Sequence, residues 1–328
     1  MKEARDYISA SAGGGRFDCL FTSGGTEADN TAIFSFARRG NAVTTLGEHS
    51  AVFEPFKHLP QGVETRFAAL RSDGSANVDD LLSKIDEKTS FVSVVHVNNE
   101  TGAINDINAI AEEVKRINPK TVFHSDGVQA FCKIPFKLSG AVDLYSVSAH
   151  KIGGLKGTGA LIKSKNLHLH PLIYGGGQEN GLRSGTENVY GIAAFYAAAK
   201  IKNGAISENF RRAEELKKIV LGGVDREIFD VISPEGGSPY ILCVTAAGLK
   251  GEVLQHKLEG KGIIVGTGSA CSSRNPHSRV LRECGYSSSK LEGVLRISFA
   301  PENDAEDAEL TVRALNEAAA ELKKIMRN

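Results

Sequence analysis

The alternation of short apolar runs with amphipathic segments over the first two thirds is what most constrains the fold of this chain. The apolar runs have the length of strands, and the segments between them have the length and spacing of helices. We predict strands at 17–22, 42–46, 63–70, 91–97, 122–124, 144–147 and 159–163, and helices at 26–39, 51–59, 78–85 and 107–117. This order is typical of an α/β fold with a mostly parallel sheet covered by helices. Ligands of such sheets bind beyond the carboxyl ends of the strands, so polar residues there are the candidates for a site.

The pattern changes near residue 205. Two helices are expected at 187–202 and 208–221, and strands at 228–232, 241–245, 263–265 and 294–299 follow, with a helix at 252–260 and another at the end. This second pattern indicates a smaller α+β unit. The 328 residues, 41% of them hydrophobic, are enough for a large domain at 1–205 and a small one at 206–328.

Charge and composition exclude several classes of partner. The 39 basic and 39 acidic residues give zero formal net charge, so no long-range field attracts nucleic acid or an anionic membrane. No apolar stretch is long enough to span a bilayer, and the first residues lack an apolar signal core, which predicts a cytoplasmic protein. The five cysteines include no CxxC pair, so we expect free thiols and no metal site.

The run Ser23-Gly24-Gly25-Thr26 lies between a predicted strand and a predicted helix. Backbone N–H groups at a helix start, together with hydroxyl groups, form an anion site. Glu27 and Asp29 in the first turn would repel a polyphosphate, so a single phosphate fits better. The alternative is that Thr26 only caps the helix.

Asp126 and Lys151 follow two consecutive predicted strands, in the runs FHSDGVQ and SVSAHKIGG. Each alone has a simpler interpretation, a turn cap for Asp126 and a surface lysine for Lys151. Together they are what a pyridoxal phosphate site needs, because a carboxylate can hold the pyridine nitrogen protonated and an amine can bind the aldehyde carbon. A lysine at the end of a buried strand can also be desolvated, which lowers its pKa.

Cys271 lies in the glycine- and serine-rich run GTGSACSS. An exposed thiol is a liability unless it is used, so we interpret Cys271 as reactive; the alternative is a tolerated surface cysteine. Cys19, Cys132 and Cys243 lie in or beside apolar strands and are predicted to be in the core, and Cys284 has no evident role.

Taken together, these runs resemble the cysteine desulfurases that serve iron–sulfur cluster and thiolated-tRNA synthesis. The matching runs, in the order of the family, are FTSGGTEADN (21–30), GEHSAV (47–52), VHVNNETG (95–102), FHSDGVQA (123–130), SVSAHKIGGLKGTGAL (146–161), GGGQENGLRSGTENV (175–189), GTGSACSS (266–273) and VLRISFAP (294–301). The resemblance implies a fold-type-I pyridoxal phosphate transferase, with a seven-stranded type of sheet in the large domain, that works as a homodimer.

The resemblance also implies a role for each candidate residue. Lys151 would be the Schiff-base lysine, Asp126 the partner of the pyridine nitrogen, and Cys271 the sulfur acceptor. The other cofactor contacts would be His49 stacked on the ring, Asn99 and Gln129 near its phenolic oxygen, Gly25, Thr26, Ser148 and His150 at the phosphate, and Thr186 at the phosphate of the partner subunit. Arg296, with Asn99 nearby, would bind the substrate carboxylate, a bidentate task suited to guanidinium.

The implied reaction converts L-cysteine to L-alanine and leaves a persulfide on Cys271, whose sulfur passes to an iron–sulfur scaffold or a tRNA-thiolation enzyme. The long segment between Cys271 and Arg296 resembles the housekeeping branch of the family. The family's opening segment, with its Asp-Asn-Ala-Ala-Thr-Thr type of stretch, is not in this sequence, which predicts impaired turnover. The alternatives are a selenocysteine lyase and a catalytically impaired scaffold of the same fold.

Overall fold

The computed structural model describes residues 1–267 and 277–327, without the side chains of the last two, and divides into two units. The first unit comprises Met1–Ala69, Ala76–Val97 and Asn105–Ile206. The second comprises Leu70–Ser75, Asn98–Ile104 and Ser207–Asn328. Two short segments from early in the chain therefore belong to the second unit, which a single boundary near residue 205 does not describe.

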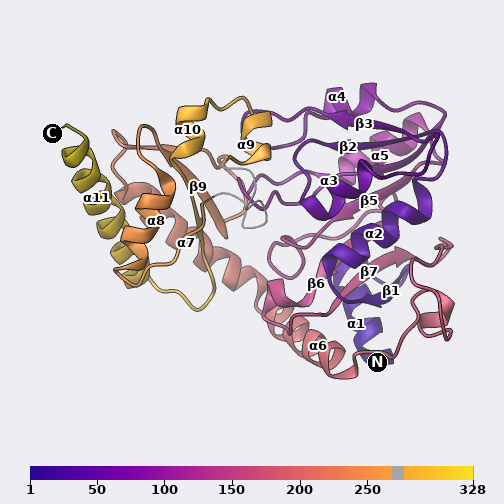
Figure 1. Cartoon of the computed structure of the whole chain (residues 1–328). Coiled ribbons are helices and arrows are strands. Elements are labelled where there is room, and N and C mark those ends of the chain that lie inside the picture. Colours follow the sequence, from indigo (N-terminus) through magenta and orange to yellow (C-terminus); the bar gives the residue numbers. More distant parts are fainter. Residues whose placement is uncertain (268–276, 328) are drawn as a thin grey trace. The chain divides into compact units, whose positions relative to one another are not determined.

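The first unit is built on a seven-stranded sheet in the order β1-β7-β6-β5-β4-β2-β3 (Figure 1). Its strands are β1 (Phe17–Thr22), β2 (Asn41–Thr45), β3 (Glu64–Ala68), β4 (Thr89–Ser93), β5 (Val122–Asp126), β6 (Leu144–Ser148) and β7 (Gly159–Ser164). The pairs from β6 through β5, β4 and β2 to β3 are parallel, and β7 pairs antiparallel with both β1 and β6. The expected α/β fold with a mostly parallel sheet is confirmed.

Helices cover both faces of this sheet (Figure 1). The helices are α1 (Lys2–Gly13), α2 (Gly25–Phe36), α3 (Ser50–Phe56), α4 (Val78–Ser83), α5 (Ile107–Ile117) and α6 (Val189–Gly204), with short 3₁₀ turns η1 (Ala149–Ile152) and η2 (Glu179–Gly181). Because side chains alternate along a strand, Phe17, Cys19 and Phe21 belong to the core on the face that α1 covers, whereas Leu20 belongs to the core on the opposite face, with residues of α2 and α3. Strands β2, β4, β5, β6 and β7 are thus buried on both faces along nearly their whole length, whereas the edge strand β3 is only partly buried.

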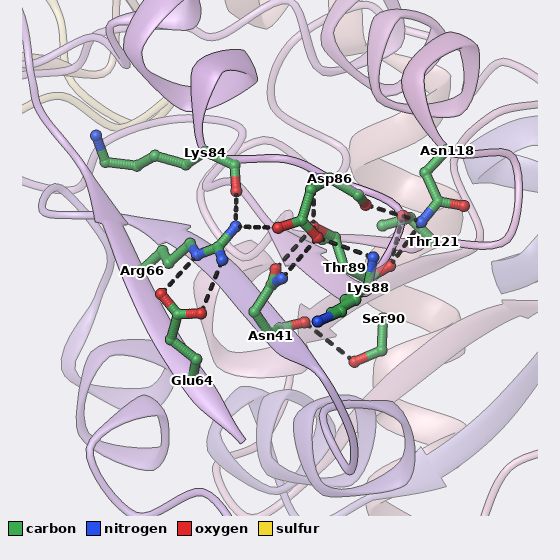
Figure 2. Close-up of polar contacts among 10 residues, drawn as sticks. All are labelled: Asn41, Glu64, Arg66, Lys84, Asp86, Lys88, Thr89, Ser90, Asn118 and Thr121. Atoms are coloured by element: carbon green, nitrogen blue, oxygen red, sulfur yellow. Dashed lines mark hydrogen bonds and ion pairs between the residues drawn. The ribbon is translucent and has the colours of Figure 1, made fainter. Parts of the chain in front are cut away.

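A network of polar side chains joins the amino ends of β2, β3 and β4 (Figure 2). Asp86 is its centre and accepts hydrogen bonds from Arg66 Nη1, Asn41 Nδ2 and the backbone N–H of Lys88, each at 2.8 Å. Arg66 also forms an ion pair with Glu64 at 2.7 Å. The Arg66 guanidinium and the other donors lower the pKa of Asp86 well below its usual value. This end of the sheet therefore holds its carboxylates ionised and paired.

The second unit contains an antiparallel sheet in the order β10-β9-β8. Its elements are α7 (Ile206–Gly223), β8 (Phe229–Val231), β9 (Ile241–Ala246), α8 (Gly251–Glu259), α9 (Arg279–Glu283), α10 (Ser288–Glu292), β10 (Val294–Ser298) and α11 (Ala305–Arg327). Leu216, Leu242, Leu254 and Leu315 lie in its core. The strand expected at 263–265 is wrong: Ile264 is exposed, and only Gly266 bridges to Arg296 of β10.

Cysteine burial and membrane topology were also expected from the sequence. Cys19, Cys132 and Cys243 are buried free thiols, which confirms their prediction as core residues, and Cys284 is half-buried. Across residues 1–267 and 277–327, none of the helices combines the length and the apolar character that a bilayer crossing requires.

Candidate active site

Asp126 is the last residue of β5, and local packing fixes it there. The next residue is a glycine because a Cβ on Gly127 would lie 1.9 Å from Cζ of Tyr145. The backbone N–H of Val128 donates to Asp126 Oδ1 at 2.9 Å, and the side chain is only 5% exposed. Burial raises the pKa of Asp126, while the charges of His49 and Lys151 lower it. A buried carboxylate at a strand end therefore has two nitrogen groups close to it.

Lys151 lies in η1, directly after the neighbouring strand β6. Because β5 and β6 are parallel, with Asp126 opposite Ser146, both strands deliver their following residues to the same edge of the sheet. The charge of Lys151 lowers the pKa of Asp126, so the two groups interact electrostatically. The expected desolvation of Lys151 is wrong for this chain, since the residue is exposed. The pairing of an acid with an amine, which carried the sequence argument, is present.

His49 is the N-cap residue of α3 and is half-buried. Its Nδ1 accepts a hydrogen bond from the backbone N–H of Ala51 at 3.1 Å. In the neutral ring the proton must therefore be on Nε2, which makes Nε2 a donor. The cap fixes both the tautomer and the ring orientation of His49.

The amino end of α2 is built to receive an anion. Its N-cap is Gly24, with no side-chain cap hydrogen bond from any residue in the described part of the chain, so Thr26 is not the cap. The first-turn N–H groups are thus left for a ligand. A Cβ on Gly25 would lie 2.8 Å from Cγ2 of Val128 and 3.7 Å from Cβ of Ser148, so the backbone itself approaches the site.

Ser148 and His150 form the opposite wall of this anion site. Ser148 ends β6 and is buried, and its Oγ lies 2.9 Å from Nδ1 of His150. Burial and the charges of nearby lysines, Lys151 first among them, lower the pKa of His150. The repulsion expected from the first-turn acid is compensated, because Arg183 pairs with Glu27 through both of its carboxylate oxygens.

Gln129 and Thr186 are less closely tied to these groups. Gln129 is half-buried and its Oε1 accepts a hydrogen bond from Lys133 Nζ at 2.9 Å. Thr186 is exposed and lines a pocket of about 140 Å³ together with Ser23, Thr158 and Arg183 of the same chain. Its contact with a phosphate of a partner subunit stays a prediction.

Asn99 and Arg296 belong to the second unit. Arg296 Nη1 donates to the backbone oxygen of Asn99 at 3.0 Å. The backbone of Arg296 also exchanges two hydrogen bonds with Gly266, at 2.7 and 2.9 Å. Arg296 is therefore anchored between the NNETG turn and the segment that leads to Cys271; Cys271 itself lies outside the described residues.

The donors present fit pyridoxal phosphate. The first unit offers a buried carboxylate for the ring nitrogen, an amine for the aldehyde and an uncapped helix start with a hydroxyl and an imidazole for the phosphate. These three kinds of group are the ones that the ring nitrogen, the aldehyde and the phosphate of that molecule require.

Sequence reasoning missed a set of polar side chains behind this edge. Ser93, His124 and Ser146 lie on strands β4, β5 and β6, and Asp29 lies on α2; all four are buried. The sequence contained a signal for them. Ser93, His124 and Ser146 interrupt the otherwise apolar strand faces that α2 covers, and Asp29 lies on α2 itself.

Comparison with known proteins agrees with this geometry. The family model described as aminotransferase class-V matches residues 1–310. Cysteine desulfurase IscS of Dictyoglomus turgidum is 34% identical over 336 residues, which cover 99% of this chain and 85% of that protein. Cysteine desulfurase IscS 1 of Archaeoglobus fulgidus is 35% identical, covering 96% and 84%. A solved structure described as a NifS-like protein superposes with a TM-score of 0.88 at 33% identity, covering 97% of this chain and 87% of the other.

The chain therefore belongs to the class-V aminotransferase family. Within that family its relatives place it among the cysteine desulfurases of the IscS/NifS type.

Proposed function

We propose that this chain converts L-cysteine to L-alanine with pyridoxal phosphate and receives the released sulfur as a persulfide on Cys271. The observation that carries the proposal is the pair Asp126 and Lys151 at the ends of adjacent parallel strands, beside an uncapped helix start. Relatives named cysteine desulfurase support this substrate, and neither a selenocysteine lyase nor an impaired scaffold is favoured by them.

Each residue has a task in the proposed reaction. Bound pyridoxal phosphate supplies an electron sink for the charge left on the substrate when its Cα proton departs. Asp126 would hold the proton of the ring nitrogen, and Lys151 would hold the cofactor aldehyde and accept the Cα proton of the substrate at Nζ. His49 stacks on the ring and donates from Nε2, and Gln129 and Asn99 contact the phenolic side.

Two different groups of residues bind the two anionic groups, the cofactor phosphate and the substrate carboxylate. Gly25, Thr26, Ser148 and His150 bind the cofactor phosphate, and Thr186 reaches the phosphate of a partner subunit in a homodimer. Arg296 binds the substrate carboxylate, because its anchored guanidinium is planar and charged at any physiological pH.

Sulfur transfer requires a thiolate on Cys271 that attacks the substrate sulfur. The C–S bond breaks as the new S–S bond forms, and the carbon fragment takes up two protons, one at Cβ and the one that Lys151 Nζ returns to Cα, to leave as alanine. We further propose that the protein acts in the cytoplasm and passes this sulfur to an iron–sulfur scaffold or a tRNA-thiolation enzyme.

The test is turnover by the protein reconstituted with pyridoxal phosphate. Wild type should be yellow and release alanine and sulfide from cysteine under a reductant, and Lys151→Ala should abolish both colour and turnover. Lys156→Ala is the matched control, because Lys156 is an exposed lysine of the same loop. A wild type that stays colourless with added cofactor would contradict the proposal.

The role of Cys271 is tested separately. Cys271→Ala should retain the colour and lose persulfide formation, which mass spectrometry detects on the protein after cysteine is added. Cys284→Ser is the control, since Cys284 is a half-buried thiol of the same unit. Unchanged sulfide release by Cys271→Ala would contradict the role of acceptor. Turnover of selenocysteine against cysteine decides the substrate.

A further inference from the structure

A line of polar side chains crosses the first unit just behind the edge that holds Asp126. Thr44 Oγ1 of β2 donates to the backbone oxygen of Ser93 at 3.0 Å, and Ser93 Oγ lies 2.8 Å from His124 Nδ1. His124 Nε2 lies 2.9 Å from Ser146 Oγ. The line follows the strand order β2-β4-β5-β6 and ends at Asp29 on α2, whose carboxyl group is hydrogen-bonded by Ser146.

Asp29 has surroundings that are unsuited to an ionised carboxylate. Its side chain is 1% exposed, and Oδ1 has no hydrogen-bond partner among the residues that the structure describes. The nearest ring nitrogen, His124 Nε2, is 3.5 Å from that oxygen. An ionised carboxylate accepts several hydrogen bonds, and burying one without them costs several kcal/mol, on the order of the penalty for an unpaired ion. The neutral acid is the form that fits.

His124 does not supply the missing positive charge. Both of its ring nitrogens meet serine hydroxyls, which suits a neutral ring with one donor and one acceptor. The ring is fully buried and stacks on Phe91, with centroids 5.9 Å apart. Burial lowers the pKa of His124 to about 3. A buried ion pair of Asp29 with His124 is therefore disfavoured.

The charges that act on Asp29 point the same way. The titratable groups facing it are Asp126 and His124 on β5 and Glu48 in the segment before α3, and β6 contributes the Ser146 hydroxyl. Burial raises the pKa of Asp29 most, the charges of Asp126 and Glu48 raise it further, and the bond from Ser146 opposes them. Two neighbouring buried carboxyls do not both ionise, so one of them keeps its proton.

Asp126 is the better of the two places for the negative charge. It accepts a hydrogen bond from the Val128 N–H, and the charges of His49 and Lys151 favour its ionised form. We propose that Asp29 is a positioning residue of the cofactor site, held as a neutral acid by Ser146 and His124, so that Asp126 alone carries the negative charge facing the ring nitrogen. This inference rests on the proposed role of Asp126.

Infrared spectroscopy of the cofactor-loaded protein tests the protonation directly. A protonated carboxylic acid has a C=O stretching band, separate from those of ionised carboxylates, that shifts in heavy water. Wild type at neutral pH should show this band, and Asp29→Asn should lack it. The proposal is overturned if no such band is removed by the substitution.

A matched pair of serine variants tests whether the infrared band belongs to Asp29. Ser146→Ala removes the hydrogen bond to Asp29 and should shift its frequency. Ser125→Ala should leave it in place, because Ser125 is equally buried and its Oγ has no partner within the described part of the protein. If Asp29→Asn does not fold, a band that responds equally to both serine variants, or to neither, still contradicts the assignment.

Two further measurements, the affinity for the cofactor and the pH profile of its visible spectrum, distinguish a failure of this proposal from a failure of the proposed role of Asp126. Asp29→Asn should bind pyridoxal phosphate within about threefold of wild type and lack any alkaline spectral transition caused by Asp29. Asp126→Asn should weaken binding by about tenfold or more. An Asp29→Asn protein as impaired as Asp126→Asn would refute a neutral Asp29. An unimpaired Asp126→Asn would instead refute the proposed function, while the infrared result would stand.

Discussion

At the amino ends of β2, β3 and β4, Asp86 is half-buried, its side chain is 44% exposed, and it accepts hydrogen bonds from a guanidinium, an amide and a backbone N–H. At the carboxyl end of β5, Asp126 is 5% exposed and Asp29 behind it is 1% exposed, with an oxygen that has no partner among the described residues. The surroundings lower the pKa of the first carboxyl and raise the pKa of the other two. The polar network at the amino ends of the strands stabilises the fold. The buried carboxyl groups at the carboxyl end lower its stability, as is expected of residues kept for a functional site.

The largest expected effect is on activity, from Asp126→Asn. We expect kcat/KM for cysteine to fall about a hundredfold or more, because the charge that stabilises the protonated ring nitrogen is lost. The free energy of unfolding should change little or rise, since a buried carboxylate is replaced by a neutral amide. Steady-state kinetics and urea unfolding of the same preparation measure both quantities. A large loss of stability in Asp126→Asn would contradict the proposed difference between Asp126 and Asp86.

The converse is expected of Asp86→Ala. Removing the acceptor leaves Arg66 Nη1, Asn41 Nδ2 and the Lys88 N–H without it, and we expect the unfolding free energy to fall by about 1–2 kcal/mol. Because the side chain is partly exposed, water replaces some of these bonds and keeps the loss below that of a buried ion. Urea unfolding measures the loss, and turnover per folded molecule should stay at the wild-type value.

The pH dependence of stability should have opposite signs at the two ends. Asp86, with its lowered pKa, stabilises the fold above its unfolded value of about 3.9, and this contribution is lost as the pH falls through the folded value. Asp29, with its raised pKa, stabilises the fold most below the unfolded value, and the contribution declines as the pH rises toward the folded value.

Asp29→Asn should therefore gain stability relative to wild type as the pH rises from about 4 to about 7, because wild type then loses the contribution of the protonated Asp29. Asp86→Asn should lose stability relative to wild type mainly as the pH rises from about 2 to about 4, and the difference should stay nearly constant above that. Urea midpoints of the three proteins at each pH test the comparison, and parallel curves for both variants would contradict it.

The smallest effect is expected from Glu64→Gln. Glu64 lies at the outer side of the Asp86 network, where its ion pair with Arg66 is open to solvent (Figure 2). Exposed ion pairs contribute little, so the urea midpoint should not change measurably. A loss as large as that of Asp86→Ala would show that the network acts as one unit.

The sequence was sufficient to predict the sheet of the first unit. Its buried strands form apolar runs, and the helices between them have apolar residues at helical spacing, such as 107–117, which α5 matches. The sequence-based prediction failed at 263–265. These three apolar residues form no strand, and the neighbouring Gly266 alone pairs with β10, through Arg296. The sequence located Asp126 and Lys151, since residues that follow parallel strands share one edge.

Other parts of the site depended on contacts between residues far apart in the chain. The pairing of Glu27 with Arg183 spans 156 positions, and the hydroxyl partners of His124 come from two different strands. Spacing along the chain does not encode such contacts. The alternative that Thr26 only caps α2 is wrong, because the N-cap is Gly24, which has no side-chain oxygen to mark the helix start in the sequence.

Helix α2 contributes to two parts of the proposed site, since Gly25 packs against Val128 and Ser148 and Asp29 interacts electrostatically with Asp126. The two residues are four positions apart, a rise of about 6 Å along a rigid α-helix. In the proposed function, the distance between the phosphate site and the acid behind Asp126 would be set by the peptide geometry of this helix rather than by adjustable side chains. Vitamers with a longer phosphate arm should be rejected even when their rings are unchanged.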